Sequence, residues 1–310
     1  MNGLITIPNL SYCAVLTVFN AEYTVGRAIQ SILDQSLPPT EIFVIDDNSQ
    51  DNSRQIVRDF VDRDPRIALI ENKTNFGQSQ NRNVGVFKSK SDFVVFFDDD
   101  DQSLPGRALE HSKMFQSGAS ISFVSSEIRY MNGYSVQARN AEYSGILDFQ
   151  KLVRKLLLGE VNESYADLSI PASTLAVRTK EFKTVGGFDP GLRRLEDVDL
   201  ALKYAQSRQV FGFSSSLLVD RYSTLSMSKG NGIDMKFESL LLNRYRGQLI
   251  HSEYVFAQKH CRTRQLYFSK QYPSLFLHLL MNPDYSLNIL KKPRTFIRRL
   301  VHDYRRRFHK

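Results

Sequence analysis

The sequence of 310 residues predicts an α/β fold in which helices flank a mostly parallel sheet. Short apolar, β-branched runs alternate with segments of helical periodicity along the first hundred residues. Strands that are separated by crossover helices form parallel sheets. In addition, the run FVVFF is apolar at every position, as expected of a strand that is buried on both faces.

The alternation begins near the amino terminus. Tyr12–Val18 (YCAVLTV) is short, apolar and β-branched, which predicts a buried strand. Residues 22–35 are expected to form a helix, because four apolar side chains recur there at helical spacing before two prolines end the pattern. Residues 41–45 (EIFVI) give the second predicted strand.

The same alternation continues to residue 97. A helix that carries Ile56 and Phe60 follows a polar turn able to cap it. A third strand at residues 66–70 and a helix over roughly Gln78–Lys88 come next, and residues 93–97 (FVVFF) form the fourth strand.

The pattern becomes mixed after residue 104. We expect helices at 104–115, 147–158 and Glu196–Gln206, and a half-buried strand at Ile121–Tyr130. Residues 234–310 read as largely helical, with three proline interruptions. The predicted organisation is therefore an α/β domain over 1–230, with halves at about 1–103 and 104–230, followed by a helical C-terminal extension over 231–310.

Composition excludes several classes of protein. With 42% hydrophobic and 24% charged residues, the chain is globular rather than disordered. Its two cysteines are too few for a disulfide framework or a cysteine-rich zinc site, which favours a reducing, cytoplasmic compartment. No apolar run approaches the roughly 20 residues that cross a bilayer, and residues 1–8 do not resemble a secretory signal.

The net charge of +8 is concentrated at one end of the chain. Residues 291–310 contain nine Lys and Arg residues and one acid, so the remaining residues balance to zero. A protein whose main function is to bind nucleic acid would carry basic charge across its binding face. In this chain the basic excess lies at one end, so we expect no nucleic-acid partner. The tail is interpreted as an accessory segment.

Four adjacent carboxylates, Asp98–Asp101, follow the fourth predicted strand. Residues two apart in an extended segment face the same side, so Asp98 and Asp100 are expected to point together and Asp99 away. That arrangement suits Mg²⁺ or Mn²⁺ held by carboxylates and substrate phosphates. The alternative is a solvated acidic turn before Pro105.

Two more polar clusters are expected at the same edge of the sheet, because the carboxyl ends of parallel strands meet there. Asp46 and Asp47 follow the second strand, where one carboxylate could accept a nucleobase N–H; an Asx turn is the alternative. Gly77 leads into a helix whose first backbone N–H groups could bind an anion, with Arg82 as a cation that matches phosphate; a surface arginine is the alternative.

The fourth cluster is acidic and opens the helix at Glu196–Gln206. Glu196, Asp197 and Asp199 are expected to gather at its first turn, away from the core. A carboxylate with an acidic neighbour keeps a raised proton affinity and can serve as a general base. Stabilisation of these acids by the helix dipole is the alternative.

Four motifs in the same order resemble those of family 2 glycosyltransferases with the GT-A fold. They are CAVLTVFNAEYTVGRAIQSILDQSLPPTEIFVIDDNSQDNS, NFGQSQNRNVG, SDFVVFFDDDDQSLPGRALE and GGFDPGLRRLEDVDLALKYA. The resemblance extends from about Tyr12 to Ser228, roughly two thirds of the chain. It implies a nucleotide-diphospho-sugar transferase fold.

On the donor side, the resemblance implies that Thr17, Phe19 and Asp46 contact the nucleobase and that Arg82 lies near the nucleotide. Many members have Tyr where this chain has Phe19, which can stack on a base but offers no hydroxyl. Family members also commonly carry a metal-proximal histidine where this chain has Ser223. The metal shell would then be completed by water, or the metal would bind weakly.

The resemblance also assigns the acidic residues. Asp98, Asp99 and Asp100 occupy the family's Asp-x-Asp segment, with Asp98 and Asp100 as metal ligands and Asp98 and Asp99 as donor contacts. Asp197 falls on the catalytic base, and Glu196 lies beside it on the acceptor side. The implied cofactor is Mn²⁺ or Mg²⁺.

The implied reaction is inverting sugar transfer from a nucleotide-diphosphate donor, most simply UDP-linked, to a hydroxyl of a glycan or lipid-linked glycan. Bacterial O-antigen, capsule or exopolysaccharide synthesis is the expected setting. Residues 287–310 form a basic amphipathic pattern that could hold the protein peripherally on an anionic cytoplasmic membrane face.

Two alternatives stay open. A nucleotidyltransferase uses a related sheet, but a Gly-rich basic loop would be expected after the first strand, where this chain has TVFNAEYT. A non-catalytic nucleotide- or glycan-binding partner on the same scaffold would tolerate replacement of Asp197.

Overall fold

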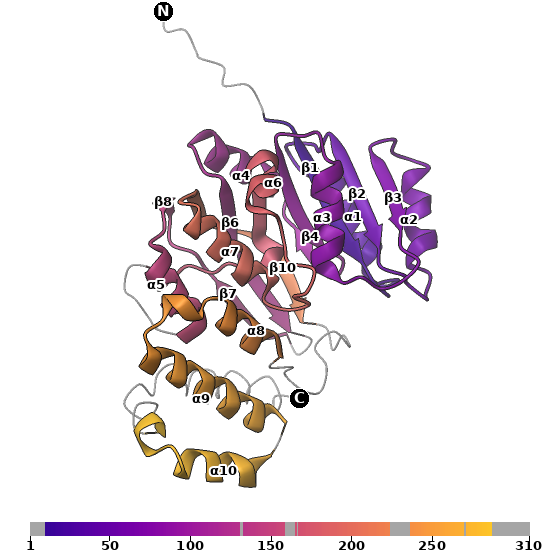
Figure 1. Ribbon diagram of the computed structural model, residues 1–310. Coiled ribbons are helices and arrows are strands. Elements are labelled where there is room, and N and C mark those ends of the chain that lie inside the picture. Colours follow the sequence, from indigo (N-terminus) through magenta and orange to yellow (C-terminus); the bar gives the residue numbers. More distant parts are fainter. Residues whose placement is uncertain are drawn as a thin grey trace, which may run out of the picture. The chain divides into compact units, whose positions relative to one another are not determined.

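The computed structural model describes residues 10–130, 133–158, 165, 167–223, 236–269 and 271–286. The chain divides into two compact units (Figure 1). The first contains residues 1–149 and 166–223, and the second contains residues 150–165 and 224–310. The segment 150–165 thus belongs with the C-terminal unit although it lies within the sequence of the first. The domain boundary expected near residue 230 stays a prediction.

The first unit is built on one mixed sheet with the strand order β3-β2-β1-β4-β9-β6-β10-β5. Its first four strands are parallel, as the alternation predicted. They are β1 (Tyr12–Val18), β2 (Glu41–Asp46), β3 (Ile67–Glu71) and β4 (Phe93–Asp98). The predicted α/β fold with a central sheet flanked by helices is confirmed.

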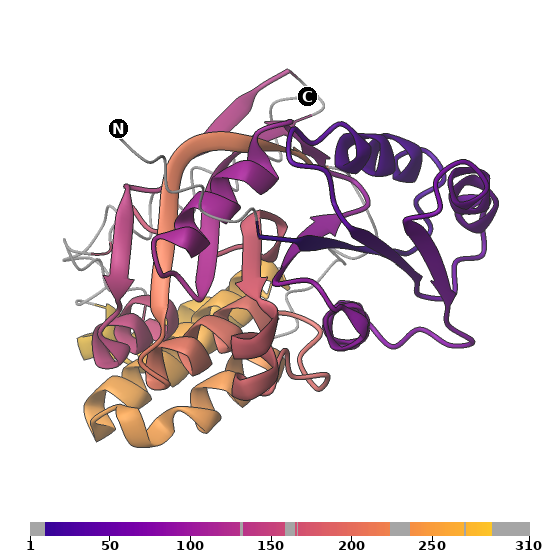
Figure 2. The ribbon, with the colours of Figure 1, turned by 90° about the horizontal axis from the view of Figure 1, so that it is seen from above.

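Helices cover both faces of this parallel half (Figure 2). The even-numbered residues of β1, such as Leu16, share a core with apolar side chains of α1 (Val25–Leu33). Val15 faces the other way, and a Cβ on Gly85 of α3 (Gln78–Lys88) would come within 2.6 Å of its methyl groups. Alternate residues of a strand point to opposite faces, so α1 and α3 lie on opposite sides. Helix α2 (Ser53–Val61) contacts α1 and β3.

The other half of the sheet mixes parallel and antiparallel pairs. Strand β9 (Leu175–Arg178) lies antiparallel between β4 and β6 (Ile121–Tyr130), whereas β10 (Val210–Ser223) runs parallel to β6. Periodicity did not predict β9 or β10. The remaining elements of this half are β5 (Gln102–Ser103), β7 (Ser135–Ala138), β8 (Tyr143–Ile146), α4 (Arg107–Gln116), α6 (Thr179–Val185) and α7 (Glu196–Gln206).

The second unit is helical in its described part. It contains α8 (Lys236–Arg244), α9 (His251–Phe268) and α10 (Tyr272–Leu280), together with a π-helical turn at Arg154–Leu158. Helix α5 (Phe149–Val153) continues directly into this turn, so the helix expected at 147–158 is found over 149–158 with a π-helical end. A small core joins the turn to α8 and α9 through Leu158, Leu242, Tyr254 and Ala257. The basic amphipathic segment expected at 287–310 lies outside the described residues.

Candidate active site

The carboxyl ends of β1, β2 and β4 bring the predicted donor residues together. Thr17 pairs in register with Asp98 of β4, and its neighbour Val18 pairs with Asp46 of β2. The three polar side chains therefore lie on adjacent strands at one edge of the sheet. This convergence follows from parallel pairing alone, which is why the sequence predicted it.

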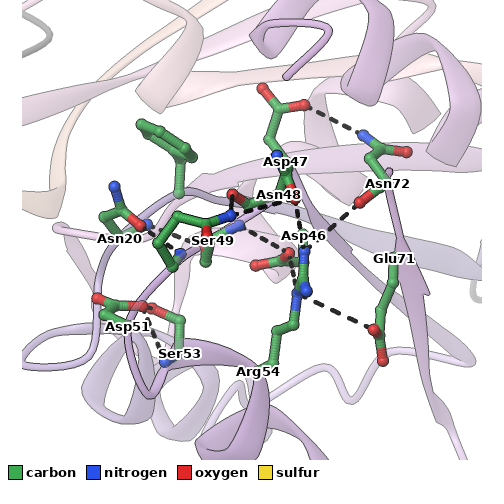
Figure 3. A network of polar contacts seen from close by, with 12 residues as sticks. Asn20, Asp46, Asp47, Asn48, Ser49, Asp51, Ser53, Arg54, Glu71 and Asn72 are labelled. Carbon is green, nitrogen blue, oxygen red and sulfur yellow. Dashed lines mark hydrogen bonds and ion pairs between the residues drawn. The ribbon is translucent and has the colours of Figure 1, made fainter. Parts of the chain in front are cut away.

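Asp46 is completely buried, and its two carboxylate oxygens have different surroundings (Figure 3). Oδ1 accepts hydrogen bonds from Arg54 Nε at 2.6 Å and from the backbone N–H of Ser49 at 3.0 Å. Among the described residues, Oδ2 has no hydrogen-bond partner. Arg54 was missed by the sequence reasoning, although a basic residue in the first turn of a helix after an acidic loop is a usable signal.

Phe19 lies in the loop after β1, which is tied to the loop after β2. The Asn20 backbone N–H donates to Ser49 Oγ at 3.0 Å, and Asn20 Oδ1 accepts the Gln50 backbone N–H at 2.8 Å. The Phe19 ring is 47% exposed, whereas Thr17 is buried. An exposed ring held beside the Asp46 loop suits stacking on a planar ligand.

The acidic run does not continue β4 as an extended segment, so that premise was wrong. The strand ends at Asp98, and the chain turns through Asp99 and Asp100. Asp99 points back toward β1, where its Oδ2 accepts the Phe19 backbone N–H at 2.9 Å. The Asp100 carbonyl accepts a hydrogen bond from Arg27 at 2.9 Å. Because residues 99 and 100 form a turn, the expected alternation, with Asp98 and Asp100 on one side of a strand and Asp99 on the other, does not apply.

Two carboxyl groups in this part of the chain, those of Asp99 and Asp101, have raised pKa values. Burial, together with the charges of Asp100 and Asp98, raises the pKa of Asp99 to about 8. Burial and the same two charges also raise the pKa of Asp101 to about 8, although Arg221 opposes the shift. A bound cation would relieve this repulsion, because carboxylate oxygens are hard ligands that Mg²⁺ and Mn²⁺ prefer.

The turn fits a cation that takes few ligands from the protein. Within the described residues no group of three or more His, Cys, Asp or Glu side chains is arranged to hold a metal ion. One oxygen of Asp98 is already engaged by Arg82. Magnesium commonly uses one or two carboxylates and completes its shell with phosphates and water, which suits this donor set.

Arg82 is buried and links the two acidic clusters, although we expected it to lie near the nucleotide. Its Nη2 donates to Asp98 at 2.8 Å and to Gln78 at 3.1 Å, and its Nη1 donates to Glu196 at 2.8 Å. Burial opposes its charge, but the two carboxylates hold the pKa of Arg82 above its ordinary value. The predicted nucleotide contact stays a prediction.

Two backbone N–H groups of the glycine turn before α3 are already engaged, while anion binding by the first turn of the helix itself stays a prediction. The backbone N–H groups of Phe76 and Gly77 donate to the Asp47 carboxylate at 2.8 and 2.9 Å. Asp47 also accepts from Asn72. The second carboxylate of the Asp46–Asp47 pair therefore fixes the entry of the helix that carries Arg82.

Helix α7 carries Asp197 at its first turn, as expected. Its Oδ1 accepts the backbone N–H of Val198 at 2.8 Å and its Oδ2 that of Ala172 at 3.3 Å, and the residue is half-buried. Burial and the charge of Glu196 raise the pKa of Asp197 to about 7, although Arg82 and the two N–H groups oppose the shift. A carboxylate in this range can accept a proton near neutral pH.

Two other expectations, one about Asp199 and one about Ser223, have different outcomes. Asp199 does not lie off the core face: it is completely buried and pairs with Lys203 at 3.1 Å, so that expectation was wrong. Ser223 ends β10, in register with Tyr130 of β6. Whether Ser223 stands in for a metal-proximal histidine stays a prediction.

Comparison with known proteins identifies the class. Residues 13–166 match the family model "Glycosyl transferase family 2". A Campylobacter jejuni GalNAc(5)-diNAcBac-PP-undecaprenol beta-1,3-glucosyltransferase is 36% identical over 101 residues, which is 32% of each chain. The Escherichia coli UDP-Glc:alpha-D-GlcNAc-diphosphoundecaprenol beta-1,3-glucosyltransferase WfgD is 31% identical over 123 residues, 39% of this chain and 47% of that protein. The chain thus spans less than two thirds of the length of these relatives.

Comparison with solved structures gives a fold that is consistent with this family. The crystal structure of S. aureus TarS 1–349 in complex with UDP-GlcNAc aligns with a TM-score of 0.62 over 84% of this chain and 74% of that chain, at 17% identity. The first unit therefore has the fold of a GT-A nucleotide-sugar transferase. The chain belongs to glycosyl transferase family 2 through the domain at residues 13–166.

Proposed function

We propose that this protein is an inverting glycosyltransferase that moves a sugar from a UDP-sugar to a hydroxyl of a lipid-linked glycan during bacterial surface polysaccharide synthesis. The observation that carries the proposal is the buried ion-pair chain Asp98–Arg82–Glu196, which joins the donor edge of the sheet to the turn that bears Asp197. The lipid-linked substrates in the names of the two undecaprenol-dependent relatives support the acceptor class.

In the proposed mechanism, Asp197 removes the proton of the acceptor hydroxyl. The hydroxyl oxygen forms a bond to the anomeric carbon while the bond from that carbon to the diphosphate breaks, so the configuration inverts. Asp98 and Asp100 would hold a divalent cation, which supplies neutralisation of the charge on the departing diphosphate. Arg82 holds Asp98 and Glu196 in place. The proposal leaves the transferred sugar open between a hexose and an N-acetylhexosamine.

Donor hydrolysis tests the proposal. A panel of nucleotide sugars would be incubated with the protein, with and without Mn²⁺, and nucleotide release measured. Slow metal-dependent release of UDP from one donor is expected, with a loss of about 10²-fold or more in Asp100→Ala because an electrostatic stabiliser of the leaving group is removed. Asp59→Asn, an exposed carboxylate on α2, is the matched control. Release that neither metal nor Asp100→Ala affects would contradict the assigned metal site.

Peripheral membrane association is a second part of the proposal. No helix in the described part of the chain is long and apolar enough to cross a membrane. Helix α10 exposes large apolar side chains one turn apart, with Phe276 70% and Leu280 66% exposed, and Met281, directly after the helix, is 72% exposed. The basic residues at 291–310 follow it in sequence. Apolar side chains that are followed in the sequence by positive charge suit the interface of an anionic bilayer.

Vesicle flotation tests this association. The protein is expected to float with phosphatidylglycerol vesicles and not with phosphatidylcholine vesicles, and less so at high salt because exposed charges are screened. The double substitution Phe276→Ser and Leu280→Ser should weaken the partition coefficient by about 10-fold or more through lost apolar burial. Ile250→Ser, exposed outside α10, is the control. Equal binding to both vesicle types would refute the proposal.

A further inference from the structure

The surroundings of Asp46 carry an inference about nucleobase selection. Two donors converge on Oδ1, the Nε–H of Arg54 and the backbone N–H of Ser49. Oδ2 is buried and lacks a partner among the residues that the structure describes. A buried acceptor without a donor is costly, so a ligand or water must satisfy it.

Arg54 is itself held in one orientation. Its Nη2 donates to Asn48 Oδ1 at 3.3 Å and to the Asn72 carbonyl at 3.5 Å, and Glu71 lies 3.9 Å from its Nε. Figure 3 shows the Arg54 guanidinium between Asp46 and Glu71. A guanidinium has no acceptor atom, so Nε can only donate to Asp46. The identity of the occupied oxygen is therefore fixed.

We propose that Arg54 is a positioning residue that presents Asp46 Oδ2 as a pure acceptor, and thereby selects a nucleobase with a ring N–H. Uracil offers such a group at N3, whereas cytosine has an unprotonated acceptor nitrogen there. This inference rests on the proposed UDP-sugar donor. Guanine also carries a ring N–H, and a GDP arm in the experiment separates the two bases.

Because two donors face Oδ1, the substitution Asp46→Asn tests which kind of base Asp46 selects. In Asp46→Asn, the amide oxygen must take the Oδ1 position, because an NH₂ group there would face two donors. The amide nitrogen then takes the Oδ2 position and donates instead of accepting. The side chain keeps its size while the hydrogen-bonding character toward the base reverses, which disfavours uracil N3–H and favours cytosine N3.

The experiment is calorimetric titration of the full chain with UDP, GDP, CDP and ADP. The native protein is expected to prefer UDP. Asp46→Asn should weaken UDP binding about 10- to 100-fold, the range set by one lost hydrogen bond to a charged group, and should bind CDP more tightly than the native protein does. Asp46→Ala should lose UDP affinity without that gain. In Asp46→Asn with Arg54→Ala, only the Ser49 N–H still favours the amide oxygen at the Oδ1 position, so the CDP gain should shrink.

Arg54 is tested in the native background as well. Arg54→Ala should reduce the preference for UDP over CDP, and Arg54→Lys, which keeps a cationic donor, should restore part of it. Arg58→Ala is the matched control, because Arg58 lies on the same helix and pairs with Glu71 at 2.7 Å. It should leave base preference unchanged.

The outcomes separate the inference from the function on which it rests. If Asp46→Asn matched Asp46→Ala, or Arg54→Ala kept native selectivity, the positioning role would be wrong while UDP binding by the native protein still supported the proposed donor. If the native protein preferred ADP or CDP, both the donor class and the inference would be wrong. A preference for GDP would keep the positioning role and change the base.

Discussion

Replacement of Asp197 with Asn is expected to lower the rate of sugar transfer by about 10²- to 10⁴-fold, the usual contribution of a general base. Donor affinity should stay near its native value, because Asp197 lies on α7, whereas Thr17, Asp46 and Asp98, which we propose to bind the donor, lie at the ends of β1, β2 and β4. The measurements are steady-state kinetics with the donor found in the hydrolysis panel and calorimetric titration of UDP.

The pH dependence of kcat/KM in the native protein is a second test of the proposed role of Asp197. Asp197 must be ionised to accept a proton, and its pKa is raised to about 7. The value of kcat/KM should therefore rise with pH through about 7 and then level off. The residual activity of Asp197→Asn should lack this acidic limb. Retention of a tenth of native activity, or an unchanged limb, would exclude Asp197 as the base.

The raised pKa also predicts a stability effect with a definite sign. The folded state favours protonated Asp197, because folding raises the pKa of this carboxyl from 3.8 to about 7. Between these two pH values the unfolded state is ionised more readily than the folded state, so the stability of the fold falls as the pH rises. Asparagine resembles the protonated acid. Asp197→Asn should therefore unfold at a higher urea concentration than the native protein at pH 8, and the difference should vanish near pH 4.

Replacement of Arg82 with Met is expected to have the largest effect on stability. The side chain is 1% exposed and pairs with both Asp98 and Glu196. Removal of one partner from a buried ion pair typically costs about 3–5 kcal/mol, because the remaining charges are left uncompensated. Urea denaturation measures the change in the free energy of unfolding.

Two further variants test the cause of that loss. Arg58→Met removes an ion pair at the surface, where the side chain is 51% exposed, and should cost at most about 1 kcal/mol. Arg82→Met combined with Glu196→Gln should recover part of the lost stability, because one uncompensated charge is removed as well. An unchanged urea midpoint in Arg82→Met would contradict the buried network.

Arg82 should also affect catalysis through Asp197. Its charge lowers the pKa of Asp197 against the opposing effects of burial and Glu196. Any residual activity of Arg82→Met should therefore show an acidic limb at higher pH than the native limb. A pure loss of folding would reduce activity without moving the limb.

Much of the fold and part of the site could be predicted from local sequence patterns. The strands of the parallel half and the helices between them follow from apolar spacing, which reports the buried face of one element at a time. The convergence of Thr17, Asp46 and Asp98 follows from the rule that parallel strands end at one edge. The position of Asp197 in the first turn of α7 was also predicted, whereas the burial of Asp199 was not.

Other features were decided only by the tertiary structure. The Arg82–Glu196 pair joins residues 114 positions apart, and β9 enters the sheet between β4 and β6. Asp47 occupies the N–H groups of a turn 29 and 30 residues away. Periodicity within one element does not reveal which distant partner its polar atoms meet. The sequence by itself thus predicted the strands and helices of the parallel half, helix α7 and the family, whereas long-range packing decided which charges of the described residues are paired, buried or left without a partner.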